Sequence, residues 1–155
     1  MNAINFEYTC ENCSTKFLAP GISDFSYGSF IMRTRTDEDI VYVDALNDKA
    51  FSDCYEIVKA NSSISKNTEI QATIQQSVFS LTCEKSPHGG VYEIGLLHPV
   101  CPHCKSRNMK SWRPSLPIQS LTLELVNHSS WNSLSMESQI ALINEGIHTY
   151  LMTKN

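Results

Sequence analysis

The residues of this chain that are best suited to chemistry are four cysteines arranged in two pairs. Cys10 and Cys13 form one Cys-x-x-Cys pair, and Cys101 and Cys104 form a second, with 87 residues between Cys13 and Cys101. Two thiolates at this spacing grip a metal ion from one tight turn, and four complete a closed tetrahedral site. A closed site is typical of structural zinc, because catalytic zinc keeps one position open. We therefore expect one structural Zn²⁺.

The alternative for these cysteines is two unrelated pairs, one of them a redox dithiol. A redox enzyme places its Cys-x-x-Cys in a βαβ context, and neither pair here begins a predicted helix. His98 and His103 flank the second pair, but the cysteines already suffice, so we expect both to be bystanders. Cys54 is expected in a hydrophobic core. Cys83 and His88 lack the further ligands that a second metal site would need.

Each cysteine pair is expected to lie between a strand and its return. Residues 6–10 alternate apolar and polar side chains, which predicts a strand that ends at the first pair. Residues 16–18 predict the return strand, before a break at Pro20-Gly21. Residues 91–97 predict a strand that leads into the second pair.

The two pairs share this plan at YTCENC, residues 8–13, and at HPVCPHC, residues 98–104. It resembles the zinc-ribbon family, in which two such knuckles face each other and share one zinc ion. The resemblance covers residues 4–18 and 92–113. Knuckles of that family usually lie closer in sequence, but the entropic cost of loop closure grows only with the logarithm of loop length. The long separation implies an insert, residues 19–91, which carries what is specific to this protein.

The insert is predicted to contain a β-hairpin and two helices. Residues 29–35 and 40–46 are rich in β-forming residues, with a tip at 36–39. Asp48 is a candidate cap for a helix over 49–60, and Asn67 for a helix over 68–81. The expected buried faces are Phe51, Cys54, Tyr55 and Val58 on the first helix, and Ile70, Ile74, Val78 and Leu81 on the second.

The C-terminal part, residues 116–155, is predicted to add a strand at 118–126 and an amphipathic helix capped by Ser135. Its expected buried stripe is Met136, Ile140, Ile143, Ile147 and either Tyr150 or Leu151. Together these elements predict an α+β fold in a single domain, residues 1–155. A four-cysteine zinc ribbon clamps the two ends of an inserted β-hairpin and helices, and the C-terminal amphipathic helix closes the core.

Acidic residues gather in the insert, and the net charge is −4. We interpret this cluster as a recognition face for a basic protein, as in an inhibitor or a bacterial toxin-immunity protein. The first functional hypothesis is therefore a small non-catalytic protein that binds another protein. The alternative is an ordinary solvated surface. The face comprises Asp37, Glu38, Asp39, Asp44, Asp48, Asp53 and Glu56.

Basic residues follow the second cysteine pair, which gives a second hypothesis: a ribbon that binds nucleic acid. Positive charges beside an aromatic ring neutralise phosphates and stack a base. The alternative is a solvated loop with its tryptophan packed on the ribbon. The residues are Lys105, Arg107, Lys110, Trp112 and Arg113.

A third hypothesis, an enzyme with dispersed residues, has no motif behind it. The sequence contains no glycine-rich phosphate loop, no Gly-x-Ser-x-Gly and no His-Glu-x-x-His. No apolar run approaches the roughly 20 residues of a membrane span. The N-terminal MNAINFEYTC has neither a basic nor an apolar segment, so we expect no signal peptide, no membrane partner and a cytoplasmic protein.

Overall fold

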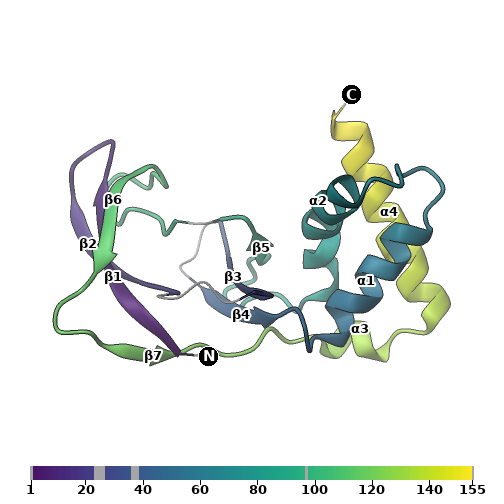
Figure 1. The fold of residues 1–155 in the computed structure, drawn as a ribbon, viewed down its shortest axis with the longest axis horizontal. Helices are drawn as coiled ribbons and strands as arrows, with labels where there is room; N and C mark the ends of the chain where they lie inside the picture. Colours follow the sequence, from purple (N-terminus) through teal and green to yellow (C-terminus); the bar gives the residue numbers. More distant parts are fainter. Residues whose placement is uncertain (1, 23–26, 36–38, 97, 155) are drawn as a thin grey trace.

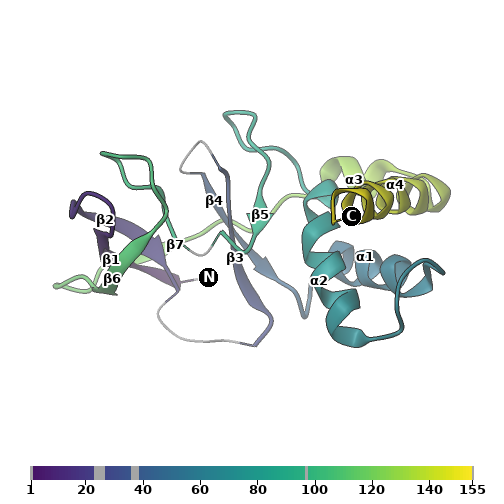
Figure 2. The same cartoon turned by 90° about the horizontal axis from the view of Figure 1, so that it is seen from above.

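The computed structural model of the chain describes residues 2–22, 27–35, 39–96 and 98–154. Within these residues the chain forms two antiparallel sheets and four α-helices, which confirms the predicted α+β class. Figures 1 and 2 show an elongated molecule with one sheet at one end, the helices at the other, and the second sheet between them.

The sheet at the far end from the helices, here called the cysteine sheet, is organised around its longest strand. This strand, β1 (Asn2–Cys10), pairs with β2 (Lys16–Gly21) on one side, and with β6 (Met109–Pro114) and β7 (Ser120–Thr122) on the other. The expected break at Pro20-Gly21 is wrong, because β2 continues through both residues. An edge strand tolerates proline, since the missing N–H faces away from the sheet.

The middle sheet, here called the insert sheet, contains the predicted hairpin. Strands β3 (Ser29–Arg33) and β4 (Ile40–Asp44) are antiparallel, and residues 36–38 of the expected tip lie outside the described residues. The expected strand over 91–97 is wrong in length and in partner. Among the described residues of this range, Glu93–Ile94 form the strand, β5, and it pairs with β3. Gly95, at φ 97°, ends the strand in a conformation that suits glycine.

The helices begin where the caps predict. The Asp48 carboxylate accepts the Phe51 N–H at the start of α1 (Lys49–Ala60), and Asn67 caps α2 (Thr68–Val78). The second helix is shorter than expected, because a 3₁₀ turn, η1 (Phe79–Thr82), follows it. The last two helices are α3 (Ser129–Ser133) and α4 (Met136–Lys154). No helix in the described part of the chain is long and apolar enough to cross a membrane.

The expected strand over 118–126 also proves shorter than predicted. Only residues 120–122 pair with β1, as β7, and further along Leu125 forms an isolated bridge with Tyr42 of β4. The chain therefore crosses from the cysteine sheet to the insert sheet within this segment, on its way to the helices.

The main hydrophobic core lies between the insert sheet and the helices, and its helix faces differ from the predicted ones. Gln75, not Leu81, is buried on α2 and η1, where its amide donates to the Phe51 carbonyl. On α4 only Ile143 and Ile147 of the predicted stripe are buried. The largest core side chains are Trp131, Phe79, Met32, Ile143 and Ile147, and sequence analysis had not singled out Trp131.

Two arginines tie the cysteine sheet to the insert sheet. The Arg107 guanidinium donates to the carbonyl of His98 at 2.7 Å and to that of Thr34 at 2.5 Å. Arg33, which is buried, donates to the carbonyl of Pro20 at 2.6 Å. Charged donors that satisfy carbonyl groups of both sheets fix how the sheets meet.

Arg107→Ala is expected to lower the free energy of unfolding by about 2 kcal/mol, because partly buried carbonyl groups lose a charged donor. The measurement is urea unfolding followed by circular dichroism. Lys110→Ala is the matched control, because it removes an exposed cation three positions after Arg107. Equal stability of the two variants would contradict a structural role for Arg107.

Candidate metal centre

The four predicted ligands converge although the two pairs are separated by 87 residues in the sequence. The sulfur atoms of Cys10 and Cys104 are 3.5 Å apart, those of Cys13 and Cys101 are 3.6 Å apart, and all four lie within 4.8 Å of one another. A disulfide would need about 2.05 Å. A tetrahedral ion with metal–sulfur bonds of about 2.3 Å has sulfur–sulfur edges of about 3.8 Å. The cluster therefore fits one metal ion.

The two knuckles have the same backbone design. In each, the first cysteine accepts an N–H from the residue after the second cysteine: Ser14 at 3.0 Å in one, Lys105 at 2.9 Å in the other. Both donors have a left-handed backbone, with φ of 59° and 62°. This turn presents two thiols to the same point. A bulge between Thr9 and Cys10 shifts the pairing of β1 with β6 at the site.

The cluster is partly enclosed by its own small core. Cys10 and Cys101 are buried with Tyr8, whereas Cys104 is exposed. His98 is not among the clustered ligands, as expected. Its ring lies against Trp112, with centroids 4.5 Å apart, and burial lowers the pKa of His98.

The thiols interact strongly with one another. A hydrogen bond with Thr15 holds the pKa of Cys13 at about 6. The Ser106 backbone lowers the pKa of Cys104, but desolvation and the three neighbouring sulfur atoms outweigh it and raise that pKa to about 12. Four thiols this close cannot all ionise without a cation, and a bound dication would relieve the repulsion.

Four sulfur ligands occupy all the coordination positions of a tetrahedral ion, so the arrangement can hold a metal ion that links the two knuckles. The Cys-x-x-Cys pairs lead into strands β2 and β6, without the helix of a redox motif. Comparisons of the chain with protein-family models, with curated proteins and with solved structures found no match.

The predicted basic surface is divided between structural and exposed roles. Arg107 is bound to carbonyl groups, and Arg113 pairs with Glu7 at 2.7 Å. Lys105 and Lys110 are exposed, and Trp112 is 52% exposed on β6. Of the predicted set, Lys105, Lys110 and Trp112 are therefore exposed, whereas Arg107 and Arg113 are held by carbonyl groups and by Glu7.

The described members of the predicted acidic face differ in burial and in partners. Asp37 and Glu38 lie outside the described residues. The prediction that Asp48 belongs to an exposed face is wrong, because its carboxylate is mostly buried and caps α1. The others each have a neighbour: Asp39 with His88, Asp44 with Asn47, Asp53 with Lys49, and Glu56 with Lys59.

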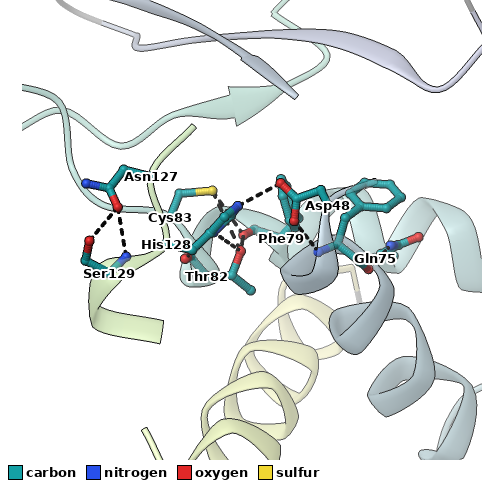
Figure 3. Close-up of polar contacts among 9 residues, drawn as sticks. Asp48, Gln75, Phe79, Thr82, Cys83, Asn127, His128 and Ser129 are labelled. Carbon is teal, nitrogen blue, oxygen red and sulfur yellow. Dashed lines mark hydrogen bonds and ion pairs between the residues drawn. The ribbon is translucent and has the colours of Figure 1, made fainter. Parts of the chain in front are cut away.

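Asp48 is mostly buried and pairs with His128, a contact that was not predicted from the sequence. Figure 3 shows His128 between Asp48 and the turn at Thr82. The His128 Nε2 lies 2.9 Å from the Asp48 carboxylate, and Nδ1 lies 2.7 Å from the Thr82 carbonyl oxygen. The Thr82 carbonyl and an ionised Asp48 are both acceptors, so this arrangement favours a proton on each ring nitrogen and therefore the charged form of His128. The side chains are only 10% and 12% exposed.

The nearby Cys83 does not complete a nucleophilic triad with this pair. Both nitrogens of His128 are already engaged, and burial raises the pKa of Cys83 to about 12. A triad would need a ring nitrogen free to take the thiol proton.

Cys10→Ser or Cys104→Ser is expected to lose bound metal and to lower the melting temperature by about 10 °C, because metal binding contributes directly to folding. Metal content is measured by mass spectrometry and unfolding by calorimetry. Cys83→Ser is the control: Cys83 packs against the main core and is not part of the cluster, so this variant should keep its metal. A metal-free Cys104→Ser that melts like the wild type would contradict a structural site.

His128→Gln is expected to cost about 1–3 kcal/mol, with a defined pH dependence. Burial opposes the charge on His128, but Asp48 and the Thr82 carbonyl outweigh it and raise the pKa of His128. Burial likewise opposes the charge on Asp48, but His128 and the Phe51 N–H prevail and lower the pKa of Asp48.

The histidine contribution is therefore full below its unfolded pKa of about 6.5 and is lost as pH rises through the folded value. The Asp48 contribution is full above its unfolded pKa of about 3.9 and is lost as pH falls through the folded value. Urea unfolding should show the largest difference between wild type and variant near pH 5.5 and a smaller one near pH 9. A difference that does not change with pH would contradict the charged pair.

Proposed function

We propose that this chain is a small zinc-binding protein of the zinc-ribbon type that has no catalytic role and acts by binding another protein. The observation that carries the proposal is the closed cluster of four sulfur ligands, which suits structural zinc and leaves no position for a reacting water. In this proposal the zinc ion braces the two knuckles, and the helices at the other end of the molecule meet the partner.

The partner is proposed to be a basic protein, by analogy with inhibitors and toxin-immunity proteins. Of the acidic residues, Asp53 and Glu56 on α1 are the best placed, because they pair only with lysines of the same helix. Such exposed pairs contribute about 0–1 kcal/mol, so a partner's cations can replace the lysines at little cost. The proposed location is the cytoplasm, where reducing conditions keep the four clustered cysteines in the reduced form that binds metal.

A nucleic-acid ligand is the second candidate, supported by the charge at the other end of the molecule. Residues 2–22 and 98–122 carry two acidic and five basic residues, against fourteen and seven in the rest of the chain. Trp112 and Lys110 are both exposed on β6, two positions apart in the sequence. This pairing suits stacking of a base beside a phosphate.

One experiment separates the two candidates. The tagged chain is isolated from its native cells with and without nuclease treatment, and the bound material is identified by mass spectrometry. The protein-binding proposal expects one basic protein at equal stoichiometry that survives nuclease. It also expects Asp53→Lys with Glu56→Lys to weaken that complex about tenfold or more, whereas Glu145→Lys on α4 leaves it intact. Loss of all bound material with nuclease would support the nucleic-acid candidate instead.

A further inference from the structure

Helices α1 and α4 form a groove of 610 Å³ on the surface of the helical end. Its walls are single stripes of the two helices. The α1 wall contains Asp53, Glu56, Ile57 and Ala60, and the α4 wall contains Met136, Gln139, Ile140 and Asn144. These positions follow the spacing of three and four residues that places side chains on one helical face. The groove is thus a continuous track between two helices.

The α4 wall of this groove exposes apolar side chains that a closed core would bury. Met136 is 73% exposed and Ile140 is 41% exposed, although both continue the stripe that buries Ile143 and Ile147 further along α4. A hydrogen bond of 2.7 Å between Asn61 and Asn144 joins the two walls. The apolar stripe of α4 is therefore buried in the core at Ile143 and Ile147 and exposed in the groove at Met136 and Ile140.

The rim of the groove is acidic on the α1 side. Asp53 and Glu56 are one turn apart, and Lys49 is the basic residue in the lining. Lys49 pairs with Asp53 across one turn, but its side chain is 83% exposed, so water screens the pair and the pair contributes little. Carboxylates on the α1 wall opposite apolar side chains on the α4 wall complement a segment that carries apolar side chains on one face and cations next to them.

We propose that the groove between α1 and α4 binds an amphipathic, basic helix of the partner protein. Apolar side chains of that helix pack on Met136 and Ile140, while its lysines or arginines meet Asp53 and Glu56. This inference rests on the proposed protein-binding function and names the surface and the type of segment bound.

The probe is a synthetic helical peptide of leucine and lysine, compared with a leucine and glutamate peptide of the same length. The chain is labelled with ¹³C at its methionine methyl groups and observed by NMR. Met152 is the matched reference, because it lies on the same helix, is 66% exposed and is outside the groove. The basic peptide should shift the Met136 signal and not that of Met152, and the acidic peptide should shift neither.

The matching variants are Met136→Glu and Met152→Glu, both at exposed positions where the fold does not depend on the side chain. Met136→Glu should weaken binding of the basic peptide, and of the natural partner, about tenfold, while Met152→Glu has no effect. Shifts at both methionines, or equal binding by both variants, would overturn the groove. A captured partner that ignores Met136→Glu would overturn the groove and leave the protein-binding function standing. Peptide binding in the groove without a captured protein partner would support the groove and count against that function.

Discussion

The structure depends on strand β1 pairing with one strand that precedes the insert sheet in the sequence and with strands that follow the second cysteine pair. It forms a hairpin with β2 and also accepts β6, so two cysteine turns that are far apart in sequence end at the same place. Only this pairing brings four thiols within 4.8 Å, a distance at which they repel as thiolates and together fit a cation. Sheet formation and metal binding therefore favour each other, since each lowers the entropic cost of closing the same long loop.

The segment between the two cysteine pairs contains the insert sheet and the helices α1 and α2. The insert sheet contacts the cysteine sheet through the guanidinium groups of Arg33 and Arg107, which donate to backbone carbonyls across the junction. On its other side, the same sheet packs into the main core with the helices. The metal cluster and the groove between α1 and α4 thus lie at opposite ends of a continuous structure (Figure 1). In the proposed function, metal binding and partner binding therefore use separate parts of the molecule.

Charge is used in three different ways along the chain. Some charged residues fix the fold: Asp48 and His128 form a buried pair, and Arg107 binds carbonyl groups. Others form weak pairs within one helix, such as Lys49 with Asp53. Lys110 stays exposed. Sequence counts do not distinguish these uses, because the same residue type has a different role according to its burial and its partners.

The sequence by itself determined the features that arise from short-range interactions. Each Cys-x-x-Cys pair followed from its own spacing, and the starts of α1 and α2 followed from caps at Asp48 and Asn67, because each of these features spans only three or four residues. Only the tertiary structure decided which helix faces are buried and that Arg107 and His128 are structural. Their partners lie 73 and 80 residues away, at Thr34 and Asp48, and such contacts exist only once the elements have packed.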